Sequence, residues 1–261
     1  MGAYEPKMAN SLILDLGNTA LKYGVFERGQ LREHGTLPEP PQLLALWQQV
    51  QPAQAIMASV VAKSDMQPWL AALAQADALA RVLPLRPGFT PVPIGNAYAT
   101  PHTLGPDRLA GAVAAAGLRP GRDTLVVDAG TALKLDLVTA DGTYHGGSIG
   151  PGLRMRLQAL HTFTGRLPLV AMPPPDEAVQ LIGDSTASAL LSGVLRGAAA
   201  EVAGLAAEYQ RRHPGLGVVL TGGDAPYLRA ALAGAVGGRI FAVPELVLLG
   251  LEMILRYNVE F

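Results

Sequence analysis

The chain has 261 residues, a formal net charge of −1 and no cysteine. Its length suffices for one large domain or two domains of ordinary size. The near-neutral charge excludes a nucleic-acid-binding protein that works through a broad basic face. The lack of cysteine excludes disulfides, thiolate catalysis, cysteine-ligated zinc and iron–sulfur clusters.

The first half of the sequence predicts three short strands joined by tight turns, followed by alternating helices and strands. The continuous apolar run at 55–61 is typical of a buried parallel strand. The predicted elements are strands Leu12–Asp15, Ala20–Phe26 and Gln30–Gly35, helix Leu43–Val50, strand Ala55–Val61, helix Asp65–Ala80, a strand near Arg81–Leu85 and a helix within Leu104–Leu118.

The second half predicts a similar succession, again opening with a hairpin. We expect a domain boundary near Pro120–Asp123, which gives domains 1–120 and 121–261. The predicted elements are a hairpin within Leu125–Gly142, strand Tyr144–Ser148, helix Leu153–Thr162, helix Ser185–Gln210, a strand within Gly217–Ala225, strand Arg239–Val243 and helix Leu246–Tyr257.

An internal repeat links the two halves. Asp15-Leu16-Gly17 matches Asp128-Ala129-Gly130, and residues 19–22 match residues 131–134 once Asn18 is skipped. Asp, Gly and Asn are common turn formers, so one copy alone favours a plain hairpin. Two copies instead indicate a duplicated architecture. They predict a cleft with paired phosphate and metal sites.

The sequence predicts a cytoplasmic protein that binds neither membrane nor nucleic acid. We find no apolar run of the roughly 20 residues that a membrane-spanning helix needs. The N-terminal MGAYEPKMAN does not place a basic segment before an apolar core, as a signal peptide would.

Six short motifs occur in an order that resembles one enzyme family. Each motif is weak alone, whereas six in order over nearly the whole chain are specific. They are DLGNTALK (Asp15–Lys22), YATPHTLGPDR (Tyr98–Arg108), DAGTA (Asp128–Ala132), GGSIGPG (Gly146–Gly152), GDST (Gly183–Thr186) and TGG (Thr221–Gly223). The sequence resembles the type III pantothenate kinases, which include Bvg accessory factor homologues, within the sugar kinase, heat-shock chaperone and actin superfamily.

The resemblance implies an α/β fold of two duplicated ribonuclease-H-like domains with mixed sheets around a nucleotide cleft. It implies ATP-dependent phosphorylation of the primary hydroxyl of pantothenate to 4′-phosphopantothenate, the first step of coenzyme A biosynthesis, by a homodimer. Two alternatives keep the same fold. One is a kinase for another small alcohol, and the other is a non-catalytic accessory or regulatory protein.

The first hairpin is the expected phosphate site. A glycine corner leaves backbone N–H groups accessible to phosphate oxygens. By resemblance, Asp15 holds Mg²⁺ through water, and hard cations do prefer oxygen ligands. A solvated strand lysine explains Lys22 equally well. The expected nucleotide contacts are Asp15, Leu16, Gly17, Asn18, Thr19, Ala20, Leu21, Lys22 and Thr131.

Asp107 is the expected general base, because a positioned carboxylate can accept the proton of an attacking hydroxyl. Arg108 offers a planar fork for a carboxylate or phosphate. Taken alone, this pair favours a helix-capping acid and a surface arginine. The resemblance also implies that Thr186 contacts pantothenate across the dimer interface. The expected substrate contacts are Tyr98, Gly105, Pro106, Asp107, Arg108 and Thr186.

Asp128 is the expected ligand of a monovalent cation, K⁺ or NH₄⁺, by resemblance. The sequence departs from the family beside it, where Lys134 stands at a position that usually holds threonine. Lys134 either echoes Lys22 by duplication or places a fixed positive charge near the cation site. In the second case it would weaken or replace the ion.

Overall fold

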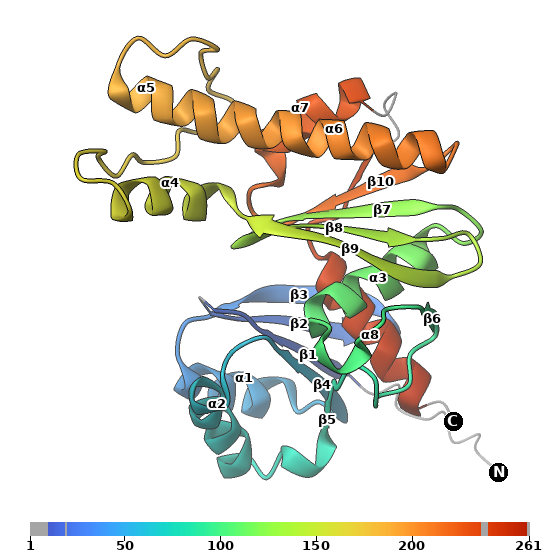
Figure 1. The fold of residues 1–261 in the computed structure, drawn as a ribbon. Coiled ribbons are helices and arrows are strands. Elements are labelled where there is room, and N and C mark those ends of the chain that lie inside the picture. Colours follow the sequence, from blue (N-terminus) through green and yellow to red (C-terminus); the bar gives the residue numbers. More distant parts are fainter. Residues whose placement is uncertain (1–9, 19, 236–239, 260–261) are drawn as a thin grey trace, which may run out of the picture. The chain divides into compact units, whose positions relative to one another are not determined.

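The structure is a computed structural model that describes residues 10–18, 20–235 and 240–259. It divides into two compact units (Figure 1). Unit 1 comprises the residues up to Leu118 and those from Leu246 onward, and unit 2 is the continuous segment Arg119–Glu245. Each unit is built around its own mixed sheet, in agreement with the predicted fold class.

Unit 1 has a sheet of strand order β3-β2-β1-β4-β5. The pairs β1–β2 and β2–β3 are antiparallel, and β1–β4 and β4–β5 are parallel. The strands of unit 1 are β1 (Ser11–Leu16), β2 (Leu21–Glu27), β3 (Gln30–Leu37), β4 (Gln54–Ser59), β5 (Val82–Pro84) and the short β6 (Gly95–Asn96). Its helices are α1 (Pro40–Val50), α2 (Lys63–Gln75), α3 (Pro106–Leu118) and α8 (Leu246–Val259), with 3₁₀ turns at Leu79–Arg81 and Pro101–Thr103.

Alternation along β1 gives the sheet of unit 1 two buried faces. Leu12 and Leu14 pack with α1 and α2, where Trp47 and Trp69 complete an apolar cluster. Helices α8 and α3 pack against each other and contact β1 and β4. Their backbones approach closely at Gly250, where a Cβ would overlap the Ala110 carbonyl oxygen. This close approach fixes α3, which begins at the candidate catalytic loop.

Unit 2 has the strand order β11-β10-β7-β8-β9. Helices α6 and α7 cover one face, with a core from Val127 and Leu220 on the strands and Val202 and Leu228 on the helices (Figure 1). The strands are β7 (Thr124–Ala129), β8 (Ala132–Val138), β9 (Thr143–Pro151), β10 (Gly217–Thr221) and β11 (Ile240–Ala242). The helices are α4 (Leu153–Thr162), α5 (Thr186–Leu191), α6 (Gly197–Arg212) and α7 (Ala225–Ala235).

The two sheets have the same topology, as the internal repeat predicts. In each, the middle strand of the order pairs antiparallel with a hairpin partner and parallel with the strand on its other side. The register also repeats: Asp15 lies opposite Lys22, and Asp128 lies opposite Lys134. A bulge follows at corresponding places, between Val25 and Phe26 and between Leu137 and Val138.

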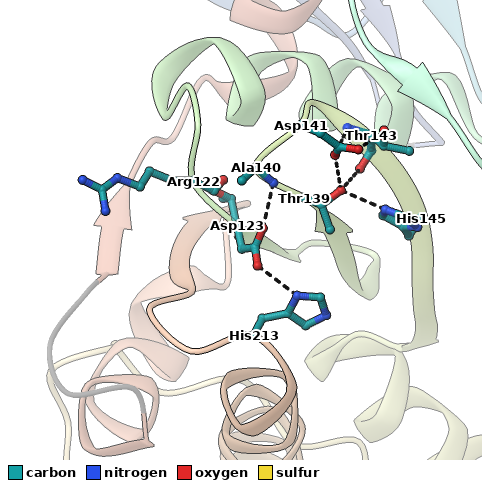
Figure 2. A network of polar contacts seen from close by, with 9 residues as sticks. Arg122, Asp123, Thr139, Ala140, Asp141, Thr143, His145 and His213 are labelled. Atoms are coloured by element: carbon teal, nitrogen blue, oxygen red, sulfur yellow. Dashed lines mark hydrogen bonds and ion pairs between the residues drawn. The ribbon is translucent and has the colours of Figure 1, made fainter.

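A polar network closes the end of the unit 2 sheet where β7 begins (Figure 2). Asp123 Oδ1 accepts the Ala140 N–H at 2.7 Å, and Asp123 Oδ2 lies 2.9 Å from His213 Nδ1. In the β8–β9 turn, Thr139 contacts both Asp141 and His145. These contacts join the start of β7, the β8–β9 turn and the segment after α6. The candidate functional residues of unit 2 lie at the opposite end of β7.

Helices α5 and α6 continue into each other through a π-helical stretch, η3 (Ser192–Arg196). Among the described residues this 186–212 helix is the single one long and apolar enough to cross a membrane by length and composition. It carries Arg196 and Glu201, and Ala198, Val202 and Ala206 are fully buried. These charges and contacts are typical of a core helix.

The closing helix differs most from expectation. The sequence assigned residues 121–261 to the second domain, whereas α8 belongs to unit 1. It packs on α3, β1 and β4 because its small and apolar residues, including Gly250 and Leu251, fit against them. Part of the predicted strand Arg239–Val243 lies outside the described residues, and its described part forms β11.

Candidate functional site

The first candidate corner lies where β1 of unit 1 ends. Asp15 is half-buried near the end of the strand, and the chain then turns, with the Gly17 N–H donating to the Ala20 carbonyl at 3.2 Å. Asn18 is exposed at the turn, and Thr19 lies outside the described residues. The sequence folds this way because Gly and Asn follow a run of buried apolar residues.

The side chains around this turn have different roles. Leu16 and Leu21 are buried in the core, so only their backbone groups can reach a ligand. Lys22 is exposed and lies directly across the hairpin from Asp15. The next strand, β4, ends at the same edge, with Ser59 opposite Leu16. The Ser59 hydroxyl is buried and has no hydrogen-bond partner within the described part of the chain.

A second group of candidates gathers at the start of α3 in unit 1. The Gly105 carbonyl accepts from Leu109 N–H at 3.1 Å, which places Asp107 in the first turn of the helix. A Cβ on Gly105 would lie 2.5 Å from Asp107 Oδ1, so the carboxylate sits over this glycine. Pro106 is buried and starts the helix, a position that suits its fixed φ.

Arg108, in the first turn of α3, stacks over Tyr98 in the loop before the helix. Arg108 is buried, with its guanidinium 5.6 Å from the centre of the Tyr98 ring. The backbone N–H of Tyr98 donates to Asn96 Oδ1 at 3.0 Å, which helps to fix the loop. A guanidinium held against an aromatic ring is pre-organised to bind a planar anion.

The corresponding corner of unit 2 lies where β7 ends. Asp128 Oδ2 and Lys134 Nζ are 2.7 Å apart, and their side chains are 20% and 14% exposed. Thr131 is exposed in the turn, and the Gly130 N–H donates to the Ala132 carbonyl at 3.2 Å. Gly152 packs so closely on this turn that a Cβ would overlap the Gly130 carbonyl.

The TGG segment after β10 completes this corner. Gly222 has a φ of 92°, which suits glycine. A Cβ there would overlap the Ala129 carbonyl and lie 2.7 Å from Asp128 Oδ1. Asp224 follows, and its N–H donates to the Ala129 carbonyl at 2.9 Å. Backbone from two neighbouring parallel strands therefore meets at Asp128.

Asp224 is a buried carboxyl at the start of α7. Burial raises its pKa above the ordinary carboxyl value, while Arg154, 3.8 Å away, partly opposes the shift. Arg154 itself is exposed and comes from the first turn of α4. These two residues therefore bring α4 and α7 to the same corner of unit 2.

Thr186 lies apart from this corner, at the start of α5. Ser185 caps the helix by accepting from the Ser188 N–H, and Thr186 is exposed as the first helical residue. Leu190 of α5 and Leu195 of the following η3 pack in one apolar cluster with Leu157 of α4. Leu181 and Ile182, just before it, are among the exposed large apolar side chains.

A family model described as type III pantothenate kinase matches residues 11–208 of this chain. The chain belongs to the type III pantothenate kinase family. A type III pantothenate kinase of Phocaeicola vulgatus is 41% identical over 250 residues, which cover 95% of this chain and 98% of the relative. One of Cytophaga hutchinsonii is 36% identical over 249 residues, covering 95% and 100%.

Solved structures outside the type III pantothenate kinases share the fold. Component A of (R)-2-hydroxyglutaryl-CoA dehydratase from Acidaminococcus fermentans superposes with a TM-score of 0.53 and 13% identity, covering 95% of this chain and 97% of that one. A ROK hexokinase from Thermus thermophilus gives 0.51 and 17%, covering 96% and 99%. At such low identity the likeness concerns the fold alone. It confirms the duplicated ribonuclease-H-like architecture.

Membership of the type III pantothenate kinases confirms the resemblance read from the six motifs. Sequence reasoning nevertheless missed three polar residues at the corners: Ser59, Arg154 and Asp224. Asp224 had a signal, since it directly follows the TGG motif. Ser59 and Arg154 had none, because an isolated serine or arginine carries no pattern before the fold places it.

Proposed function

We propose that this protein transfers the γ-phosphoryl group of ATP to the primary hydroxyl of pantothenate, the first step of coenzyme A biosynthesis. The family match over residues 11–208 carries the proposal. The grouping of Asp107, Arg108 and Tyr98 at the start of α3 supports it. Phosphoryl transfer needs positioning and charge neutralisation more than covalent chemistry, and these residues are suited to both.

Asp107 acts as the general base in this proposal. It lies in the first turn of α3, with its carboxylate over Gly105, which has no side chain. The carboxylate accepts the proton as the hydroxyl oxygen attacks phosphorus, while the bond from phosphorus to the ADP oxygen breaks. The close packing of α3 on α8 keeps the base in place.

Arg108 positions the acceptor in this proposal. Its guanidinium stays charged at every physiological pH and presents several N–H donors in one plane. Stacking on Tyr98 reduces the number of orientations that the guanidinium can adopt. Pantothenate carries a carboxylate that this fork can bind in two-point fashion. A carboxylate bound there leaves the distant hydroxyl to be placed by Asp107.

ATP phosphates bind at the turn after β1 in this proposal. Gly17, Asn18, Thr19 and Ala20 supply backbone groups, Leu16 and Leu21 contribute only backbone, and Lys22 adds positive charge from across the hairpin. The Asp15 carboxylate near the end of β1 offers the oxygen ligands that hydrated Mg²⁺ prefers. When bound, Mg²⁺ neutralises charge on the phosphate oxygens.

Unit 2 has nucleotide contacts of its own in this proposal. Thr131 is exposed in the turn after β7 and contacts ATP, while Gly222 and Gly223 let the nucleoside lie against backbone. The resemblance also implies a monovalent cation at Asp128. That carboxylate is ion-paired with Lys134, so it does not fit as a ligand of a free cation. The proposed reaction therefore has no step through that ion.

The proposed active form is a cytoplasmic homodimer. Thr186 of one protomer then reaches the pantothenate bound by its partner. Exposed apolar side chains close to Thr186 support this assembly, since Ile182 is 82% exposed and Leu181 is 71% exposed. Light scattering should give twice the 27.2 kDa of one chain. A monomer at the concentrations of a kinetic assay would contradict the dimer.

A coupled ADP-release assay tests the function. Pantothenate should support turnover, and a panel of other small primary alcohols should not. The variant Asp107→Asn should lower kcat about 10²–10⁴-fold, the usual cost of a lost general base. The matched control is Asp65→Asn, which alters another exposed first-turn acid, in α2, and should leave kcat unchanged.

The possible outcomes distinguish a pantothenate kinase from a kinase for another alcohol and from a regulatory protein. Turnover with another alcohol but not pantothenate would show a kinase of different specificity. ATP binding without turnover on any alcohol would contradict the enzyme and favour a regulatory protein. Full activity of Asp107→Asn would leave the kinase intact and remove Asp107 as its base.

A further inference from the structure

Lys134 lies beside Asp128 in unit 2, where the resemblance implies a monovalent cation. Its Nζ lies 2.7 Å from Asp128 Oδ2, within charge-assisted hydrogen-bond distance. The two residues face each other across the β7–β8 hairpin, so the backbone register brings them together. Both side chains are mostly buried, which weakens the screening of their attraction by solvent.

Glycine backbone packs against the Asp128 carboxylate on the side away from Lys134. Gly222 and Gly130 lie against Asp128 Oδ1, where added Cβ atoms would be 2.7 and 3.6 Å away. Oδ2 is thus taken by the ammonium, and Oδ1 faces glycine backbone. A diffusible K⁺ or NH₄⁺ at this carboxylate would meet the ammonium charge of Lys134, and like charges this close repel each other.

The described part of the chain offers no alternative acidic cage. It contains no group of three or more His, Asp or Glu residues arranged to hold a metal ion. The carboxylate and the ammonium together carry no net charge. The electrostatic attraction that would draw a monovalent cation to Asp128 is therefore cancelled by a charge that is covalently part of the protein.

We propose that the Lys134 ammonium is a built-in cation that serves the nucleotide-binding corner of unit 2 and makes this kinase independent of K⁺ and NH₄⁺. The inference rests on the proposed function insofar as Thr131, in the turn between Asp128 and Lys134, contacts ATP. A tethered ammonium needs no binding step and has a constant local concentration. It neutralises the Asp128 carboxylate beside the bound nucleotide whatever salt is present.

The first test uses the unmodified protein. Affinity for a non-hydrolysable ATP analogue is measured by calorimetry, and pantothenate phosphorylation by ADP release, in KCl, NH₄Cl, NaCl and choline chloride. At matched ionic strength both quantities should agree within about twofold, because only general screening acts. An increase of tenfold or more in K⁺ over Na⁺, in either quantity, would overturn the inference.

The second test removes the charge. Lys134→Met should weaken analogue binding about 10–100-fold in NaCl, as expected for loss of a hydrogen bond to a charged group. Part of the loss should be recovered in KCl, because Asp128 is then able to hold a diffusible ion. Lys134→Arg should keep K⁺-independent binding. A Lys134→Met protein that binds like the wild type, in both salts, would also overturn the inference.

Lys22 provides the matched control, because it holds the same register position in the other hairpin. Lys22→Met is expected to weaken analogue binding without creating any difference between KCl and NaCl. Analogue binding needs no turnover, so the two proposals can fail separately. Cation-independent binding without pantothenate phosphorylation would contradict the function alone, and K⁺-dependent phosphorylation would contradict the built-in cation alone.

Discussion

The hairpin that opens unit 1 and the hairpin that opens unit 2 share a register but differ in their charges. Asp15 faces Lys22 and Asp128 faces Lys134, and each pair is followed by a bulge at the same distance. Yet Lys22 is exposed, whereas Lys134 is mostly buried and ion-paired. Duplication preserved the backbone, and the side-chain environments diverged.

The connections explain part of this divergence. Leu16 pairs with Leu21, whereas Ala129 pairs with Leu133, so four residues (17–20) connect the first pair and three (130–132) the second. The neighbouring strand differs as well: Ser59 ends β4, while Gly222 follows β10. Glycine lets backbone crowd onto Asp128, which shields its ion pair from solvent. One repeated pattern thus provides the proposed metal ligand in one unit and a fixed ion pair in the other.

The largest expected contrast concerns the two aspartates. Asp15→Asn should lower kcat/KM for ATP about 10²–10³-fold, because charge neutralisation by a metal contributes several kcal/mol to the transition state. Asp128→Asn should lower it less than about tenfold, because the Lys134 charge remains. Steady-state kinetics at varied Mg²⁺ measure both, with melting curves to confirm folding. Equal losses in the two variants would break the comparison.

The next contrast concerns helical glycines. Gly250→Ala in unit 1 would push a methyl group into the Ala110 carbonyl, and overpacking of this kind costs about 1–3 kcal/mol. Gly204→Ala, on α6 of unit 2, meets nothing within 4 Å and should stabilise by about 0.5–1 kcal/mol. Urea unfolding measures both. A neutral Gly250→Ala would mean that α3 and α8 can separate without cost.

A buried hydrogen bond in unit 2 has a surface counterpart in unit 1. The Tyr144 hydroxyl donates to Asp136 at 2.8 Å inside the core, and the Tyr23 hydroxyl donates to Glu33 at 2.8 Å in solvent. Tyr144→Phe should cost about 1–2 kcal/mol, since a buried carboxylate oxygen loses a donor. Tyr23→Phe should stay within about 0.5 kcal/mol. Calorimetric melting distinguishes them, and equal effects would contradict the contrast.

The smallest expected effect depends on pH. Burial raises the pKa of Asp224 above the ordinary 3.8, so the folded protein binds this proton more tightly than the unfolded chain does. The wild type therefore loses stability as the pH rises through that raised value. Asp224→Asn should melt about 1–2 °C higher at pH 7 and show no gain below pH 3.8. The exposed Asp176→Asn is the matched control for the loss of one carboxylate.

Much of the fold could be predicted from the sequence because its strongest signals are local. The repeated Asp-x-Gly corners mark strand ends, and apolar runs such as 55–61 mark buried strands. The place of α8 could not be predicted. An apolar helix shows which face is buried but not which sheet covers it, and only the fit of Gly250 on Ala110 decides that.

The candidate site was predictable in outline for the same reason. Motif order indicated Asp107, Arg108 and the two hairpins, which lie at a helix start and at strand ends, and their roles stay a prediction. A fixed positive charge at Lys134 was one of two open alternatives, since sequence spacing alone does not give a side chain its direction. Asp224 and Ser59 could be identified as site candidates only from the fold, which brings the ends of neighbouring strands together.

The discontinuity of unit 1 affects the order in which the chain matures on the ribosome. Unit 2 is a single uninterrupted segment and can acquire all of its strands and helices before α8 is made. Unit 1 starts first but lacks α8 until the residues after Glu245 emerge, so the apolar face of α3 stays uncovered while unit 2 is synthesised. The half of the protein that is made first is thus completed last, and premature termination after Glu245 would leave it open.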